Sequence, residues 1–238
     1  MNTATDSPVT YLVDESRIEA LHDEMIAGDG ELRDHVVMID ASLDFIHQVV
    51  IAEPHKDTEE LILLRLSIRC FNSGAASLRL VRCGYWQPAF ALMRDLLETL
   101  FLVDLLNWDR KEAKRWHSLS EKERREAFHP AKVRDRLDAR DGLTERERKK
   151  AYDRLSGYAA HPTPQGFSVI SPDMMTQVGP FPDRKNLRAA LQELVKRLTN
   201  AASVIGSIIK TDEPEMKSIK MDFRTKLRRW SSKYIATE

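Results

Sequence analysis

Glycine and cysteine are both scarce in this sequence, with 9 glycines and 2 cysteines among 238 residues. Leucine, alanine, glutamate, lysine and arginine are abundant instead, and this composition favours helices over sheets. Cys70 and Cys83 stand in one predicted helix, which would hold them on the order of 20 Å apart, too far for a disulfide. We therefore expect two reduced thiols, which are typical of a cytosolic protein.

The sequence also lacks a leader and an uninterrupted apolar run. Its first residues show no basic region followed by an apolar one, so we expect no signal peptide. The most apolar stretch, 88–107, is interrupted by Arg94, Asp95, Glu98 and Asp104, which argues against a membrane span. These absences predict a cytoplasmic protein.

The common catalytic and cofactor motifs are absent as well. There is no Gly-rich phosphate loop, no Ser/His/Asp or Cys/His nucleophile motif and no zinc-ligand spacing, so we predict no cofactor. Three carboxylates stand three residues before a histidine, as in di-iron helical bundles. Such a site also needs two further glutamates, which the sequence does not identify, and we predict no metal site. The three pairs are Glu19/His22, Asp44/His47 and Glu126/His129.

Apolar spacing and helix caps predict a single all-α domain over residues 1–238, an antiparallel bundle of about seven to nine helices. Short capped helices are expected between 109 and 142. A long proline-rich loop follows near 161–182, with a short hairpin at Phe167–Ile170. The longer predicted helices cover 14–27, 31–52, 57–83, 88–107, 145–160, 184–210 and 213–234.

Charge is unevenly distributed although the net charge is zero. Residues 1–60 hold 15 acidic and 3 basic side chains, residues 109–154 hold 11 and 16, and residues 155–238 hold 8 and 13. The two parts could complement each other within the fold or between chains, or leave a basic face free for an anionic partner. The basic C-terminal helix is expected to pack on the bundle through Phe223 and Trp230, the alternatives being nucleic acid or a membrane surface.

Two features favour a homodimer. The small residues Ser73–Ser77 would allow another backbone to approach closely. The second helix carries apolar residues at alternating spacings of four and three, a seam that suits long antiparallel helix packing. The seam consists of Leu32, Val36, Ile39, Leu43, Ile46 and Val50.

Arg94 and Glu98 lie one helical turn apart on the most apolar helix. Either charge alone would be costly to bury, so each should pair with the other or with a neighbouring helix. We predict a polar core pair that fixes how the helices pack. The alternative is a polar functional site inside the bundle.

Arg154, Tyr158 and His161 form the candidate catalytic group. A straight helix would place Arg154 and His161 on one face, two turns or about 10.5 Å apart, with Tyr158 between them. An arginine can hold a phosphate and a histidine can transfer protons, so the group suits phosphodiester chemistry. In the alternative interpretation His161 caps the end of the helix.

The segment Arg154–His161 resembles the Arg-x(4–6)-His signature of the HEPN superfamily. The segment Met93–Glu98 is similar to a helix of bacterial all-helical proteins of unknown function. Some of those, including AbiV-like proteins, are tied to abortive infection and phage defence. The resemblance covers residues 60–165.

HEPN proteins are helical bundles that commonly dimerise, and many are metal-independent ribonucleases. The resemblance implies that Arg154 holds the scissile phosphate and that His161 is the general acid or base, with Tyr158 in the same site. It also implies RNA, a second copy and a protein of a phage-defence or toxin system as partners. The alternative is a non-catalytic interaction or dimerisation module, in which Arg94/Glu98 and Arg154/His161 are structural.

Overall fold

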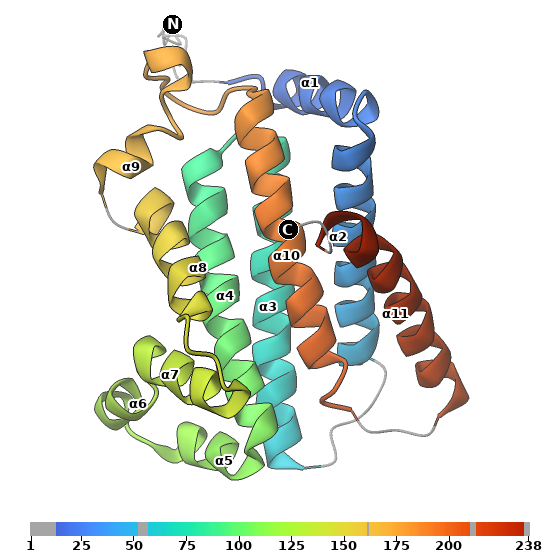
Figure 1. The fold of residues 1–238 in the computed structure, drawn as a ribbon, viewed down its shortest axis with the longest axis vertical. Helices are drawn as coiled ribbons and strands as arrows, with labels where there is room; N and C mark the ends of the chain where they lie inside the picture. Colours follow the sequence, from blue (N-terminus) through green and yellow to red (C-terminus); the bar gives the residue numbers. More distant parts are fainter. Residues whose placement is uncertain (1–12, 52–56, 161, 210–212, 236–238) are drawn as a thin grey trace, which may run out of the picture.

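The computed structural model describes residues 13–51, 57–160, 162–209 and 213–235. These residues form an all-α bundle without a strand, which confirms the predicted fold class (Figure 1). The hairpin predicted at Phe167–Ile170 is wrong, because a short helix, α9 (Pro164–Phe167), ends there and a turn follows. A 3-10 turn, η2 (Pro172–Met174), is the other regular element in the described part of the proline-rich loop.

Long helices make up the body of the bundle. Helices α3 and α4 are antiparallel neighbours, α10 packs against α2, α3 and α4, and α11 lies along the outer side of α2 (Figure 1). The shorter α1 (Glu15–Ala27) lies across one end, above α2 and α3. The long helices are α2 (Gly30–Ile51), α3 (Thr58–Arg82), α4 (Trp86–Trp108), α10 (Arg184–Ile205) and α11 (Pro214–Tyr234).

Helix α4 is the central element, as its apolar sequence predicts. It begins at Trp86, two residues before the predicted start of the helix at residue 88. Neighbours cover it on several sides: α3, α5, α7, α8 and α10 all contact it. Its buried residues are Trp86, Ala89, Phe90, Met93, Leu96, Leu97, Thr99, Leu100, Phe101, Val103, Leu105 and Leu106.

The basic segment 109–154 folds into four short helices beside α4: α5 (Arg110–Ser118), α6 (Glu121–Ala127), α7 (Pro130–Asp141) and α8 (Glu147–Leu155). Ion pairs connect α7 to α4 and α8 to α7. Arg140 on α7 donates two hydrogen bonds to Asp104 on α4, at 2.8 and 3.0 Å. Arg148 on α8 donates to Asp138 on α7 at 2.6 Å. Several arginines of this segment therefore hold the fold together instead of facing a partner.

The acidic N-terminal part also finds its partners within the chain. Asp29 accepts hydrogen bonds from both Arg184 and Arg188 at the start of α10. Glu19 on α1 accepts two from Arg79 on α3, each of 2.7 Å. These acidic residues of the N-terminal part therefore pair with arginines of the same chain, and not with a partner molecule.

The two sequence features that favoured a dimer have separate outcomes. The small-residue segment of α3 packs inside the chain: a Cβ at Gly74 would stand 2.6 Å from the Leu198 side chain of α10. Ser73 donates to Asp95 on α4. The seam of α2 is mixed, with Leu32, Ile39 and Ile46 buried and Val36, Leu43 and Val50 half-buried.

Helix α11 packs on the bundle through its aromatic residues, as predicted. Phe223 stacks on Phe45 with ring centroids 4.3 Å apart. The Trp230 indole N–H donates to Nδ1 of the buried His35 at 3.1 Å. Most basic side chains of α11 are exposed, whereas Lys220 is half-buried and donates to the Ile209 carbonyl at 2.5 Å.

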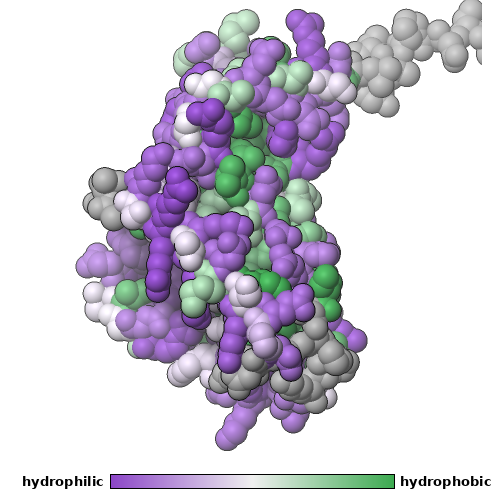
Figure 2. Space-filling view, turned by 90° about the vertical axis from the view of Figure 1, so that its right-hand side faces the viewer, coloured by the Kyte–Doolittle hydropathy of each residue, from purple (hydrophilic) through white to green (hydrophobic). Residues whose placement is uncertain are grey.

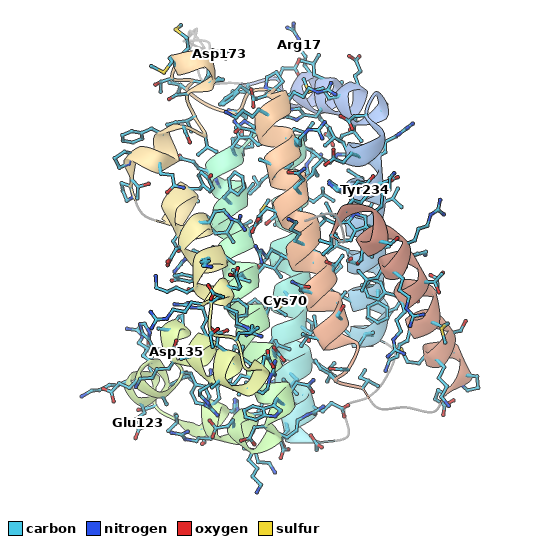
Figure 3. The ribbon with its side chains drawn as sticks, viewed as in Figure 1. Arg17, Cys70, Glu123, Asp135, Asp173 and Tyr234 are labelled. Atoms are coloured by element: carbon cyan, nitrogen blue, oxygen red, sulfur yellow. The ribbon has the colours of Figure 1, made fainter. Side chains whose placement is uncertain are left out.

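Both cysteines are free, and Cys70 lies in the middle of the bundle (Figure 3). Burial raises the pKa of the Cys70 thiol to about 12. Among the described helices, α3 alone is long and apolar enough to cross a membrane by length and composition, and 44% of its apolar window is buried in the bundle.

Gly84 makes the turn between α3 and α4 and touches the segment before α10. Its φ of +80° is in the left-handed region, and a Cβ there would lie 2.5 Å from the Phe181 carbonyl oxygen. Gly142 ends α7 at a similar φ of +67°, with nothing within 4 Å of its Cβ position.

Replacing each of these two glycines with alanine measures two costs in unfolding free energy: that of the left-handed backbone alone at Gly142, and that of backbone and close packing together at Gly84. We expect Gly142→Ala to cost about 1–2 kcal/mol, the left-handed penalty alone. Gly84→Ala should cost a further ~1–3 kcal/mol, because the methyl group would overlap backbone atoms that cannot easily move. Urea unfolding of both variants measures the difference. Equal losses would show that the approach of Phe181 to Gly84 is not a constraint.

His22 is a buried histidine that links three elements. Its Nδ1 lies 2.7 Å from the Arg82 carbonyl oxygen, and its Nε2 accepts the Asp183 backbone N–H at 3.3 Å. The ring therefore donates from Nδ1 and accepts at Nε2, which requires the neutral form. Burial is the largest effect on its pKa and lowers it from the ordinary 6.5. The pKa of His35 is lowered for the same reason.

These histidines make the fold sensitive to mild acid. Because the folded-state pKa lies below 6.5, the unfolded chain binds the proton more readily. Stability should be complete above pH 6.5 and fall as the pH decreases below it. We expect the urea concentration at the midpoint of unfolding to be lower at about pH 5.5 than at about pH 7.5. His22→Asn should make this dependence shallower, whereas His47→Asn, at an exposed position, should not. A flat midpoint in the unmodified protein would contradict the prediction.

Candidate functional site

A cleft of about 580 Å³ lies between the end of α8 and the first half of α10. The loop that contains η2 borders it on one side, and Figure 3 shows Asp173 of this loop at the end of the molecule. Two of the three predicted catalytic residues, Arg154 and Tyr158, line the cleft. The rest of the lining includes Phe90, Leu155, Ser168, Val169, Lys185, Asn186, Gln192, Glu193 and Lys196.

Arg154 is oriented by an acidic residue of α10. Its guanidinium lies 3.4 Å from Glu193, and its side chain is still 53% exposed. The Glu193 side chain is only 12% exposed and accepts a second, shorter bond of 2.7 Å from Nε of the buried Arg197. Arg197 therefore holds Glu193 in place. Glu193 in turn positions Arg154, whose side chain remains open to the cleft.

Tyr158 belongs to a π-helix, η1 (Ser156–Ala160), which directly follows α8. Its ring packs against Phe90 of α4, with centroids 5.5 Å apart. The Thr163 hydroxyl donates to the Gly157 carbonyl at 2.5 Å, and the amide end of the Gln165 side chain lies against Gly157, where a Cβ would have to displace it. The π-helix is thus fixed by the segment after it. Such wide turns are frequent at functional sites.

The π-helix corrects one step of the sequence argument. The separation of about 10.5 Å between Arg154 and His161 assumed a straight α-helix. Here the hydrogen bonding changes to i→i+5 after Leu155, so seven residues no longer make two regular turns. His161 itself lies outside the described residues. The structure therefore brings Arg154 and Tyr158 together, and the position of His161 relative to them stays a prediction.

Sequence reasoning missed the side of the cleft that α10 provides. Lys185, Gln192 and Lys196 recur at spacings of seven and four, so they lie on one face of α10. That face is the polar one, opposite the apolar residues by which the helix was recognised. A search for lysine and glutamine at helical spacing beside the predicted loop would have identified it.

The cleft carries acidic as well as basic groups. Asp173, Asp183 and Glu193 line it together with Arg154, Lys185 and Lys196. Two of these carboxylates already accept hydrogen bonds within the chain: Asp183 caps α10 by accepting the Asn186 N–H at 2.6 Å, and Glu193 accepts from Arg197. The arrangement suits a small number of phosphate contacts, and it does not form a broad basic surface.

Arg94 and Glu98 lie where α4 meets α8, and both side chains are half-buried. They pair at 2.9 Å, as predicted, but not deep inside the bundle. Arg94 also donates to the Ser156 hydroxyl at 3.0 Å and to the Tyr152 hydroxyl. The guanidiniums of Arg94 and Arg134 lie over the Tyr152 ring, 4.8 and 4.1 Å from its centroid. The pair therefore fastens α8 to α4 just before Arg154.

The three carboxylate–histidine pairs serve other purposes. Both ring nitrogens of His22 bond backbone groups, and His129 caps α7 by accepting the Ala131 N–H at 3.3 Å. His47 is exposed, and its partner carboxylate Asp44 accepts from Gln48. Across the described parts of the chain, no three His, Cys, Asp or Glu side chains converge as metal ligands would.

No protein-family model matches this chain, and no curated protein or solved structure matches it either. The geometry of the cleft is therefore the basis for a functional proposal, together with the HEPN resemblance of Arg154–His161.

The two arginines should behave differently when truncated. Arg94→Ala leaves Glu98 and the Tyr152 hydroxyl without a half-buried partner, so we expect a loss of about 1–3 kcal/mol in unfolding free energy. Arg154→Ala removes an exposed side chain, and its effect should stay within about 0.5 kcal/mol. Urea unfolding of both variants tests this. A large loss for Arg154→Ala would assign that residue to the structure and not to the site.

Proposed function

We propose that this chain is an RNA-acting protein of the HEPN type, which binds RNA phosphate in the α8–α10 cleft and cleaves the strand without a metal ion. One observation carries the proposal: Arg154 and Tyr158 line the same open cleft as Lys185 and Lys196 from a different helix. The role in a phage-defence or toxin system follows from the resemblance alone and is part of the same proposal. The cytoplasmic location, which was predicted from the sequence, is also part of it.

The lining offers the contacts that a nucleotide needs. A guanidinium such as that of Arg154 binds phosphate oxygens in pairs, and lysines add point charges. The half-buried ring of Tyr158, which packs on the buried Phe90, provides a surface for a base, since single-stranded RNA is commonly recognised by stacking on aromatic side chains. The cleft volume of about 580 Å³ is in the range of small-ligand sites.

The proposed reaction needs one proton acceptor and one proton donor. The acceptor takes the proton of the ribose 2′-hydroxyl, whose oxygen forms a bond to phosphorus while the bond from phosphorus to the 5′-oxygen breaks. The donor returns a proton to that 5′-oxygen. His161 is proposed for one of these roles, because imidazole titrates near neutral pH. Arg154 stabilises the charge on the phosphate oxygens.

RNA cleavage in the presence of a chelator tests this function. The unmodified protein should cleave single-stranded RNA with EDTA present. Arg154→Ala and His161→Ala should each lower the rate about 100-fold or more, the scale of losing an electrostatic or acid–base group. Lys149→Ala is the matched control, because it removes an exposed cation of α8 that does not line the cleft.

Two results would contradict the proposal. One is the absence of cleavage of any RNA by the folded protein. The other is cleavage that survives both substitutions. Binding of fluorescein-labelled RNA, measured by anisotropy, separates the parts of the proposal: His161→Ala should bind RNA normally, and Arg154→Ala should bind it more weakly.

A non-catalytic interaction module is the second candidate function. It is favoured by a separate observation, an apolar groove between α2 and α11 on the other side of α10 from the cleft. In that case Arg94 and Arg154 would serve the structure only.

A further inference from the structure

The two ends of the cleft between α8 and α10 differ in charge. At one end, the Arg154 guanidinium lies 3.4 Å from Glu193 of α10, and Lys196 lines the cleft less than one turn further along that helix. At the other end the lining includes Asp183 and Asn186, at the start of α10. Asp183 precedes Glu193 by ten residues, about 15 Å along the helix axis. A bound molecule can therefore extend from a cationic end to a different set of polar groups.

The end of the cleft at the start of α10 presents hydrogen-bond acceptors. One carboxylate oxygen of Asp183 accepts the backbone N–H of Asn186 at 2.6 Å, which holds this carboxylate against the first turn of α10. The side-chain amide of Asn186 donates to the Val169 carbonyl at 3.2 Å. Among the described residues, no donor reaches the amide oxygen of Asn186 or the second oxygen of Asp183, and no cation pairs with Asp183. Two half-buried side chains thus offer acceptors to a ligand.

An aromatic ring lies between the two ends. Tyr158 follows Arg154 by four residues, and because α8 and α10 run in opposite directions, it lies on the Asp183 side of Arg154 (Figure 1). Its half-buried ring packs on Phe90. Asp173 of the η2 loop also lines the cleft, and no cation of the described residues pairs with it. A nucleotide with its phosphate at Arg154 would place its base over Tyr158 and the outer edge of the base towards these acceptors.

Among the four RNA bases, guanine has the edge that matches such acceptors. Its Watson–Crick edge presents two neighbouring donors, the N1–H and the 2-amino group, which a carboxylate can accept together. Adenine and cytosine each present one amino group beside a bare ring nitrogen, whose lone pair would face the carboxylate. Uracil presents one N–H between two carbonyl oxygens. Hydrogen bonds to an ionised acceptor are about twice as strong as neutral ones, which increases the difference between the bases.

We propose that the cleft selects guanine, with the Asp183 carboxylate accepting hydrogen bonds from the N1–H and the 2-amino group and with the Asn186 amide oxygen as a further acceptor. The ligand is a guanosine phosphate, either free or within an RNA strand. This inference rests on the proposed function for the phosphate contact at Arg154. It gives a role to carboxylates that would otherwise only repel an anionic ligand.

Titration calorimetry of the full chain with nucleoside 3′-monophosphates tests the choice of base. The guanosine compound should bind about tenfold or more tightly than the adenosine, cytidine and uridine compounds, the scale of one hydrogen bond to a charged group. The inosine compound keeps the N1–H but lacks the 2-amino group, so its affinity should lie between those of guanosine and adenosine. Equal affinity for all of them, or no binding of any, would overturn the proposal.

Asp183→Asn tests the residue. Asparagine is also a good helix cap, so the variant should stay folded, and its amide NH₂ would replace the carboxylate oxygen that is left for guanine. Affinity for the guanosine compound should fall about tenfold or more, whereas adenosine, whose N1 can accept from the amide, should bind no more weakly than before. Asp57→Asn is the matched control, because Asp57 caps α3 in the same way and does not line the cleft. An unchanged preference for guanosine in Asp183→Asn would overturn the proposal.

A second control concerns the basic helix α11. Its side of the molecule faces the viewer in Figure 2, and the described residues that line the cleft include none from this helix. Arg229→Ala removes an exposed cation there and should leave the affinity for the guanosine compound unchanged. Loss of binding in this variant would place the nucleotide on α11 and would also overturn the proposal.

Mapping of RNA cuts separates this inference from the proposed function. If both hold, cuts in an RNA of mixed sequence lie next to guanosines with EDTA present, and Asp183→Asn reduces that preference. Cuts without regard to sequence would overturn guanine selection and leave the cleavage function standing. Selective binding of the guanosine compound by a protein that cleaves no RNA would support guanine selection for a free nucleotide and contradict the proposed cleavage.

Discussion

The structure depends on how the charged side chains of α4 are satisfied. This helix is buried on several sides, and a charge on it is costly unless a neighbouring helix supplies a partner. Asp95 is bonded by Arg69 of α3, Arg94 by Tyr152 of α8 and Asp104 by Arg140 of α7. Each pair fixes the height at which one neighbour packs against α4. The apolar surface alone would allow several registers, since leucine-rich faces slide past each other with little loss.

The cleft follows from this arrangement. Helix α8 is held by Arg94 and Tyr152 shortly before Arg154, and the π-helix then turns Tyr158 towards Phe90 of α4. Helix α10 packs on α4 as well, and it supplies Glu193, which orients Arg154. The helices on both sides of the cleft, α8 and α10, therefore pack against the same central helix, α4. Residues far apart in the sequence keep a fixed relation for that reason.

Local signals in the sequence were sufficient for the helices but not for the site. Asp57 and Asp183 cap the helices that were predicted over 57–83 and 184–210, and such caps can be recognised locally because a cap depends on neighbours within three residues. The change to i→i+5 bonding after Leu155 has no residue signature, so the sequence contained no reason to expect anything but a straight α-helix over Ser156–Ala160. His22 could not be recognised as buried, because its partners are backbone atoms 60 and 161 residues away. Lys196 was missed because it lies on a polar helix face that resembles any solvated one.

The balance of charge limits how an RNA could be recognised. Many acidic side chains of residues 1–60 and many of the later arginines form ion pairs within the chain. The net charge of the whole sequence is zero. A neutral protein attracts a polyanion only weakly over distance. Among the described residues that line the cleft, the cations are Arg154, Lys185 and Lys196, and three carboxylates stand beside them. Affinity would then depend on close contacts, among them stacking on Tyr158, and less on counterion release than for a strongly basic RNA-binding protein.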